Sequence, residues 1–281
     1  MFSIVIPTLN NFNYLKICLE SLKKNSVLNH EIIIHVNEGN DGTLDYLKKN
    51  NYIFTYSEQR LGLCSSTNLA SKKATKEYVL YSHDDMYFLP DWDLVLKDEL
   101  SKVKNNLFYL SGTMIGPGEH INFNCGTTYQ NFDEKKLLKN YKNYNLYDHQ
   151  GTHWAPHLIH KNLWKKIYGF SEEFDPGFGS DPDLNMKLWE EGVRYFKGIN
   201  NFKVYHFGSI SLRKKPDLKA NKGSITFLKK WGITISFFKK EYLRSGEKFY
   251  GELIEPKRNF FYYLGLLKCK IKFFFILFKI N

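Results

Sequence analysis

The first hundred residues alternate between short apolar runs and segments whose apolar residues recur at helical spacing. Four continuous apolar runs have the length and composition of buried strands, and they occupy residues 2–7, 31–36, 52–57 and 77–82. The intervening segments 13–24, 41–49 and 65–75 are predicted helices. Strands that alternate with helices predict an α/β fold with a mostly parallel, Rossmann-like central sheet flanked by helices. Ligands of such sheets bind beyond the carboxyl ends of the strands.

The pattern changes in the second hundred residues. Residues 105–160 are rich in Gly, Asn and Tyr and are predicted to form loops. Helical spacing resumes at 158–170, and a Gly-rich turn then leads into a helix expected from Pro182 to Glu191. A final strand is expected at 202–209.

Charge is distributed unevenly along this globular, 43% hydrophobic chain. The formal net charge is +11, but residues 1–212 hold 23 Lys and Arg against 24 Asp and Glu. Residues 213–281, which we call the C-terminal extension, hold 17 Lys and Arg against 5 Asp and Glu. This asymmetry predicts that the extension contacts an anionic surface, either a membrane or a nucleic acid.

The end of the extension is aromatic and basic. Residues 259–280 are very apolar but are interrupted by Lys268, Lys270 and Lys272, whereas a membrane-spanning helix needs about 20 nearly uncharged residues. Lys268, Lys272 and Lys279 share one face of a helix. We favour a basic helix that lies at a membrane surface. The alternative is a helix packed on the body with its lysines pointing outward.

The four cysteines and the N-terminus indicate a reducing compartment. The cysteines are scattered with no Cys-x-x-Cys pair, which argues against a zinc knuckle or a redox motif. The N-terminal run meets Pro7 early and is predicted to be the first strand, not a signal peptide. We expect a cytoplasmic protein, at the inner face of the membrane if the extension binds lipid.

Candidate chemistry lies where predicted strands and helices begin or end. Asp84 and Asp85 follow the fourth strand, and adjacent carboxylates repel unless a cation or hydrogen-bond donors offset them. A divalent metal is one solution and a solvated turn is the other. Asp181 precedes a helix-starting proline, so it is predicted to be an N-cap, and a capping carboxylate is also rigidly positioned, as a general base must be. His206 ends the last strand as a metal ligand or a hydrogen-bonded core histidine.

Taken in order, these segments resemble the family 2 glycosyltransferases, which have the GT-A fold. The resemblance runs from about residue 2 to 212 and rests on "IVIPTLNN", "EIIIHVNEGNDGT", "QRLGLCSSTNLA", "EYVLYSHDDMYFLPDW", "GFSEEFDPGFGSDPDLNMKLW" and "VYHFGS". It implies an inverting enzyme that moves a sugar from a nucleotide-sugar donor to a hydroxyl of a glycan or lipid-linked acceptor. The implied cofactor is Mn²⁺ or Mg²⁺.

The resemblance also implies roles for individual residues. Those facing the donor would be Pro7, Thr8, Glu38, Gly62, Asn68 and Asp84. Asp85 and His206 would hold the metal, and Asp181 would be the general base. The chain departs from the family pattern at His83, Ser180 and Asn37, where the family frequently has acidic residues.

The resemblance sets the expected domains and the acceptor site. We expect a glycosyltransferase domain over residues 1–212, with a nucleotide-sugar-binding half at 1–104 and an acceptor-binding half at 105–212. Aromatic faces suit sugar rings, so Trp154 and Trp164 are candidate acceptor contacts, and the alternative is that both are core residues.

Two other classes of protein compete with this interpretation. A nucleotidylyltransferase would need a Gly-rich, basic phosphate loop near residues 8–20, and the sequence there lacks one. A non-catalytic module could bind nucleotides, or nucleic acid through the interleaved Phe and Lys of the extension. The dense Phe and the lysine face suit a bilayer better, so no nucleic-acid partner is expected.

Overall fold

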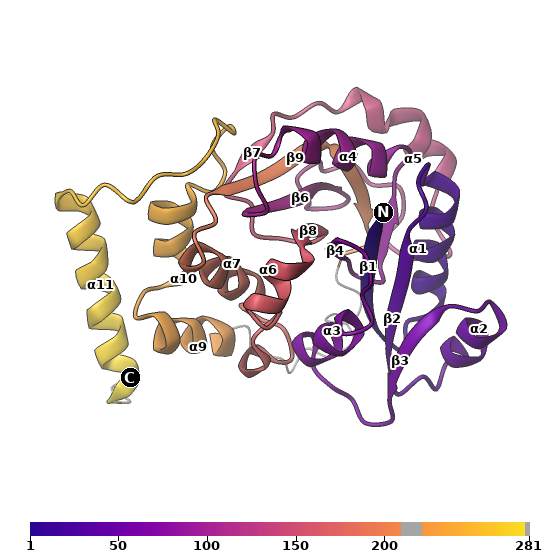
Figure 1. The fold of residues 1–281 in the computed structure, drawn as a ribbon, viewed down its shortest axis with the longest axis horizontal. Helices are drawn as coiled ribbons and strands as arrows, with labels where there is room; N and C mark the ends of the chain where they lie inside the picture. Colours follow the sequence, from indigo (N-terminus) through magenta and orange to yellow (C-terminus); the bar gives the residue numbers. More distant parts are fainter. Residues whose placement is uncertain (209–220, 279–281) are drawn as a thin grey trace.

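The computed structural model describes residues 1–208 and 221–278, and its centre is one mixed sheet of nine strands (Figure 1). The strands run in the order β3-β2-β1-β4-β8-β6-β9-β5, and β7 pairs with β9. Their bounds are β1 Phe2–Leu9, β2 Glu31–Asn37, β3 Ile53–Ser57, β4 Tyr78–Tyr81, β5 Met86–Phe88, β6 Phe108–Ile115, β7 His149–Gln150, β8 His157–His160 and β9 Tyr195–His206.

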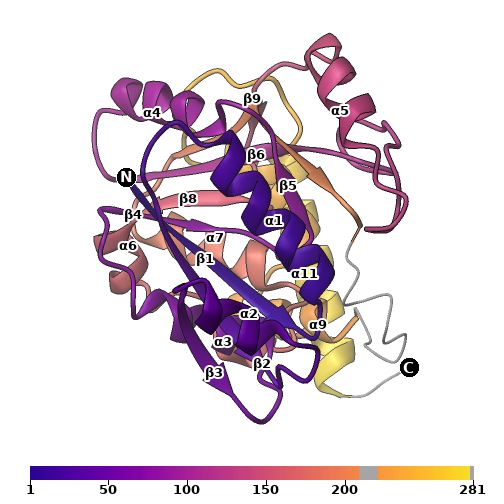
Figure 2. The ribbon, with the colours of Figure 1, turned by 90° about the vertical axis from the view of Figure 1, so that its right-hand side faces the viewer.

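Helices cover both faces of the sheet, with α1 on one side and α7 on the other (Figure 2). The helices are α1 Phe12–Asn25, α2 Thr43–Lys49, α3 Leu63–Ser71, α4 Trp92–Lys102, α5 Glu134–Asn140, α6 Lys161–Lys166, α7 Ser180–Glu190, α9 Asn221–Trp231, α10 Ile235–Phe237 and α11 Phe260–Leu277. Shorter helical turns occupy Tyr141–Asn143, Glu172–Phe174 and Phe238–Leu243.

The N-terminal half of the sheet matches the expectation. Strands β3, β2, β1 and β4 pair in parallel, and β1 is buried along most of its length, as its continuous apolar run predicts. The carboxyl ends of β1, β2 and β4 therefore meet at one edge, which carries Thr8, Asn37 and the Asp84–Asp85 pair.

The C-terminal half of the sheet corrects the expectation, because the sheet is mixed. β8 lies antiparallel between β4 and β6, although its residues were expected to begin a helix. Helix α6 starts only at Lys161, since the His160 side chain accepts a hydrogen bond from Asn162 N–H and caps it. β6 was expected to be a loop, yet it is buried and its Ser111 and Thr113 hydroxyls hydrogen-bond to Thr152 and to the Ile199 carbonyl.

The described part of the C-terminal extension packs on the body. Phe227, Phe238, Leu243 and Leu253 are buried in the same hydrophobic core as the sheet. The boundary expected between residues 212 and 213 lies outside the described residues, and the expected division at residue 105 stays a prediction. None of the described helices combines the length and the apolar character that crossing a bilayer requires.

Helix α11 stands at one edge of the molecule, beside α9 and α10 (Figure 1). It packs through Tyr262 and Cys269, which are buried, and through Gly265, which lies against the Phe237 ring. Its outward side leaves large apolar residues exposed, namely Phe260, Phe261, Tyr263, Leu264, Leu267, Ile271, Phe274 and Phe275. At 3.6 residues per turn, most of them form an arc opposite the packed face, with the exposed Lys270 on one side and Lys268 and Lys272 on the other.

Candidate active site

A cleft of about 360 Å³ opens at the carboxyl ends of the parallel strands. Its walls come from five segments, which are residues 7–9, Asn37, 60–66, 81–85 and 176–181. Six of the predicted site residues line it, namely Pro7, Thr8, Gly62, Asp84, Asp85 and Asp181. The topology thus brings together Pro7 and Asp181, which are 174 positions apart along the sequence.

Asp84 is held on the β1 side of the cleft by neutral donors. Its two carboxylate oxygens accept hydrogen bonds from the Thr8 hydroxyl at 2.6 Å and from the Asn11 amide at 3.1 Å. Asp84 is 5% exposed, so these bonds fix its orientation in a buried setting.

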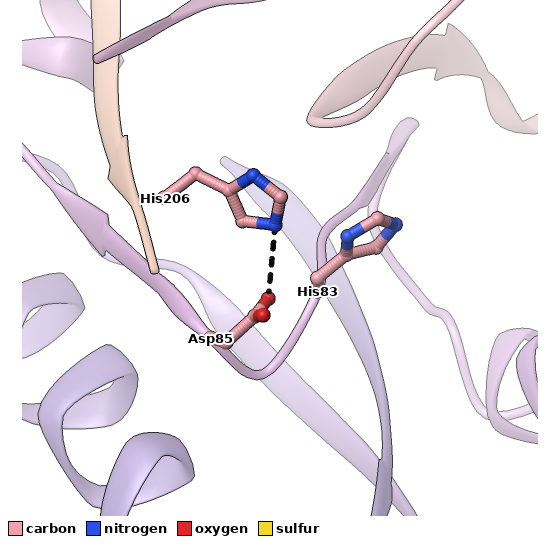
Figure 3. Close-up of side chains that lie close together, drawn as sticks. All are labelled: His83, Asp85 and His206. Atoms are coloured by element: carbon pink, nitrogen blue, oxygen red, sulfur yellow. Dashed lines mark ion pairs between the residues drawn. The ribbon is translucent and has the colours of Figure 1, made fainter. Parts of the chain in front are cut away.

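Asp85 contacts β9, whereas Asp84 contacts the β1 side. Met86 lies opposite His206 in the antiparallel pairing of β5 with β9, and Phe207 N–H donates to the Asp85 carbonyl. This register places the His206 Nε2 atom 3.4 Å from an Asp85 carboxylate oxygen (Figure 3). The two predicted metal ligands are therefore neighbours.

His83 joins this pair and forms a three-residue group with it. One ligand atom from each of His83, Asp85 and His206 lies within 4.8 Å of the others, and both imidazoles stand beside the carboxylate in Figure 3. Burial lowers the pKa of His83 to about 4, so its ring is neutral and has a lone pair for a metal. His83 departs from the acidic family pattern, yet its ring nitrogen lies close to the candidate ligand atoms of Asp85 and His206.

Glu119 supports His206 from the other side, and no sequence pattern pointed to it. Its carboxylate lies 2.6 Å from His206 Nδ1. Burial alone would lower the pKa of His206, but Asp85 and Glu119 outweigh it and raise the pKa to about 10. A carboxylate on the outer nitrogen of a histidine is the usual support for a metal-ligating imidazole. The donor set of two imidazoles and a carboxylate fits a divalent metal ion, which would displace the proton from His206 Nε2.

Asp181 lines the opposite wall and does not cap its helix. Helix α7 begins at Ser180, two residues earlier than an Asp181 cap would require, and its N-cap is Gly179, whose φ of 82° suits glycine. One Asp181 oxygen is buried without a hydrogen-bond partner among the described residues. Burial raises the pKa of Asp181 to about 7. The predicted N-cap role of Asp181 is therefore wrong, and the carboxyl group is poised to exchange a proton near neutral pH.

Asp175 locks the loop before α7 onto the start of α3, a contact that the sequence did not reveal. Its carboxylate accepts hydrogen bonds from Cys64 N–H at 2.7 Å and from the Ser65 hydroxyl at 2.5 Å. A Cβ atom on Gly62 would lie 2.0 Å from the Asp175 carboxyl carbon. Glycine is thus required at position 62 because Asp175 packs directly on it.

Asn37 and Arg60 are two further cleft residues that the sequence did not single out as contacts. The Asn37 side-chain oxygen Oδ1 accepts from Leu61 N–H at 2.8 Å, and the side-chain amide Nδ2 donates to the Ser66 hydroxyl at 3.0 Å. Asn37 thereby fastens the segment that carries Arg60. Among the described residues lining the cleft, Arg60 is the sole lysine or arginine, so it supplies positive charge for an anionic ligand.

Five predicted site residues do not line the cleft, and one of them is His206, which reaches Asp85 from β9. Glu38 lies next to it and accepts a hydrogen bond from the Asn10 amide at 2.7 Å. Asn68 exchanges hydrogen bonds with both backbone groups of Phe170, so it fixes a loop and has its amide turned away from the cleft residues.

The two tryptophans are also held by the protein itself. The Trp164 ring is buried, and its indole N–H donates to the Ser71 hydroxyl at 3.0 Å. The half-buried Trp154 donates to the Gly112 carbonyl at 2.7 Å. Trp164 is therefore a core residue, which was the alternative to its role as an acceptor contact. Neither tryptophan ring forms a wall of the cleft.

Comparison with known proteins identifies the family. The model of glycosyl transferase family 2 matches residues 3–158, which is more than half of the chain. The chain belongs to this family. Hyaluronan synthase from Pasteurella multocida is 27% identical over 229 residues, which cover 79% of this chain and 22% of the synthase. The chain thus spans about a fifth of the length of that relative.

Solved structures of other glycosyltransferases share the fold. Staphylococcus aureus TarS 1–349 in complex with UDP-GlcNAc aligns with a TM-score of 0.53 at 17% identity, covering 81% of this chain and 70% of TarS. GalNAc-T7 with UDP, GalNAc and Mn²⁺ aligns with a TM-score of 0.57 at 17% identity, covering 73% of this chain and 43% of that protein. The expected GT-A type of α/β fold is confirmed.

The buried state of Asp181 predicts an unusual pH dependence of stability. Because folding raises the pKa of this carboxyl group, the stability it contributes is complete below about pH 4 and is lost as the pH rises through about 7. The Asn side chain of Asp181→Asn cannot ionise, so this variant does not lose that stability as the pH rises. We expect the variant to melt a few degrees above wild type at pH 8, with a difference that shrinks steadily toward pH 4.

Thermal melts at several pH values measure this difference. The matched control is Asp183→Asn on the same helix, because the Asp183 carboxylate accepts a hydrogen bond from the Trp231 indole at 2.8 Å and pairs with Lys230 at 3.0 Å. That variant should melt below wild type at pH 8. An Asp181→Asn variant that also melts lower would show that its carboxylate has a stabilising partner.

Proposed function

We propose that this glycosyltransferase moves a sugar from a nucleotide-sugar donor to a hydroxyl of a glycan or lipid-linked acceptor, in surface polysaccharide synthesis. The observation that carries the proposal is one cleft with Asp181 on one wall and with His83 and Asp85 on the other. One Asp181 oxygen is buried without a partner among the described residues, and His206 completes the group of His83 and Asp85 from behind the wall. The names of the similar proteins, hyaluronan synthase and a TarS complex with UDP-GlcNAc, agree with this substrate class.

The donor would occupy the strand-end side of the cleft. Pro7 and Thr8 form part of that wall, and Thr8 also fixes Asp84, which we assign to the ribose or diphosphate end of the donor. Arg60 would offset negative charge on the donor. Gly62 keeps the start of α3 close to the cleft because Asp175 leaves no room for a side chain there.

His83, Asp85 and His206 would hold a divalent metal, with Glu119 orienting His206. Two imidazoles favour Mn²⁺ over Mg²⁺, which prefers an all-oxygen shell. When bound, such an ion supplies positive charge that stabilises the departing diphosphate.

Asp181 would act as the general base. It accepts the proton of the acceptor hydroxyl while that oxygen forms a bond to the anomeric carbon of the donor and the bond to the diphosphate breaks. This single in-line displacement inverts the anomeric configuration. A base whose pKa is about 7 is half ionised at neutral pH, and general-base assistance is typically worth about 10²–10⁴-fold in rate.

Asp181→Asn tests the base assignment. The amide cannot accept the proton, so transfer should fall by at least about 10²-fold, whereas donor binding should change little. Transfer is measured with a panel that includes UDP-GlcNAc and GDP-mannose, and binding of the same donors by calorimetry. A loss of donor affinity that matches the loss of transfer would contradict the assignment.

Asp85 and Glu119 variants test the metal site. We expect Asp85→Ala to abolish Mn²⁺ binding, and Glu119→Gln to weaken it by about 10–100-fold because His206 loses its orienting carboxylate. Calorimetric titration of Mn²⁺ into the protein without donor measures both effects. Glu134→Gln is the control, because that carboxylate hydrogen-bonds Tyr87 and not the metal group. Wild-type Mn²⁺ affinity in Asp85→Ala would refute the site.

Helix α11 would hold the enzyme at an anionic membrane surface. Its exposed aromatic arc, flanked by Lys268, Lys270 and Lys272, has the arrangement of a helix that lies in the headgroup region. The excess positive charge of the extension matches the negative potential of anionic lipids. Such an anchor would bring the cleft to lipid-linked acceptors.

Charge reversal on α11 tests the membrane contact. Each lysine near an anionic surface contributes about 1 kcal/mol, so reversing Lys268, Lys270 and Lys272 to Glu should weaken binding to phosphatidylglycerol vesicles by about a hundredfold or more. The control reverses Lys48, Lys49 and Lys72, exposed lysines that lie on or just after α2 and α3, away from α11. Vesicle pelleting measures binding. Equal loss in both triple variants, or preferential binding of wild type to single-stranded DNA, would contradict the proposal.

A further inference from the structure

Tyr81 is a buried tyrosine whose hydroxyl has no partner in the described part of the chain. It is the last residue of β4, it is 0% exposed, and it lines the candidate cleft. Its hydroxyl oxygen is hydrogen-bonded to nothing within residues 1–208 and 221–278. Because buried polar groups are almost always paired, such an exception indicates a partner that binds from outside the chain.

The aromatic ring of Tyr81 is held in place from several sides. Its centroid lies 5.5 Å from the His83 ring, 5.0 Å from the His157 ring and 5.1 Å from the Phe170 ring. A ring packed in this way cannot turn its hydroxyl toward another protein group without disturbing the core. The hydroxyl is therefore a fixed, buried polar group of a residue that lines the cleft.

A nearby tyrosine shows that the core can satisfy such a group. Tyr109 is equally buried, but its hydroxyl lies 3.0 Å from His157 Nδ1 and donates to the Trp154 carbonyl at 3.2 Å. Tyr109 does not line the cleft, whereas Tyr81 does. The tyrosine that faces the protein is paired, and the tyrosine that faces the cleft is not paired within the described residues.

A second unpaired polar atom belongs to the same cleft. One Asp181 oxygen is buried and lacks a partner among the described residues. A phosphate near this carboxylate would be repelled, so a neutral ligand hydroxyl that accepts from the phenol suits this part of the cleft. The Tyr81 ring also touches His83, a member of the group assigned to the diphosphate end, so a sugar joined to that diphosphate comes within reach.

We propose that the Tyr81 hydroxyl donates a hydrogen bond to a hydroxyl of the donor sugar and so helps to select that sugar, an assignment that rests on the proposed function. Tyr81 is then a specificity-determining residue that distinguishes the nucleotide sugar from its nucleoside diphosphate.

Tyr81→Phe removes only this oxygen and tests the proposal. Calorimetry with Mn²⁺ compares UDP-GlcNAc with UDP, and GDP-mannose with GDP, in wild type and variant. We expect the variant to lose about tenfold in affinity for the bound nucleotide sugar and none for the matching diphosphate. Among the 3-, 4- and 6-deoxy forms of that donor, one should bind wild type more weakly than the complete donor does. That deoxy form should bind Tyr81→Phe as well as it binds wild type.

Tyr109→Phe is the matched control for the fold. It leaves His157 and the Trp154 carbonyl without their partner, so it should lower the melting temperature, whereas Tyr81→Phe should not. A Tyr81→Phe variant that melts as low as Tyr109→Phe, or that binds the nucleotide sugar as tightly as wild type, overturns the proposal. Absence of nucleotide-sugar binding to wild type itself overturns the proposed function, and this proposal with it.

Discussion

The register between β5 and β9 is the constraint on which the candidate site depends. Met86 must lie opposite His206 for Asp85 and His206 to meet, although these residues are more than a hundred positions apart in the sequence. A slip by one residue would turn the His206 side chain to the other face of the sheet. β9 is held against that slip on both edges, because it also pairs in parallel with β6, where Ile115 lies opposite Tyr205.

The same strand end explains how two adjacent carboxylates can be buried together. Asp84 is satisfied by neutral donors from the β1 side, the Thr8 hydroxyl and the Asn11 amide. Asp85 is satisfied by His206, which also contacts Glu119. Each acid therefore has its own source of stabilisation. The substitution of an acidic residue by His83 avoids a third negative charge at this position, since burial keeps its imidazole neutral.

The parts of the site that depend on local pattern are the parts that the sequence predicts correctly. The apolar runs of β1, β2 and β4 are continuous, so the pattern alone places their polar ends at one edge of a sheet. β6 and β8 escape prediction because Ser111, Thr113, His157 and His160 interrupt their apolar pattern. The hydrogen-bond partners of Ser111, Thr113 and His157 lie far away in the sequence. Glu119 and Asp175 escape for the same reason. Each acts through a contact that no local spacing encodes.

The start of α7 shows how structure can separate capping from catalysis. A carboxylate that caps a helix accepts backbone N–H groups, and this stabilises its charge and lowers its pKa. Such a group would be a weak base. In this chain Gly179 takes the cap position with a left-handed backbone, and a Cβ there would press against the Gly223 backbone at 3.1 Å. Asp181 is thereby moved into the first helical turn with one oxygen unpaired among the described residues, where burial raises the pKa of its carboxyl group. Because Gly179 takes the cap position, Asp181 has no capping role. Burial disfavours the charged form of its carboxyl group, so the carboxylate is a base near neutral pH.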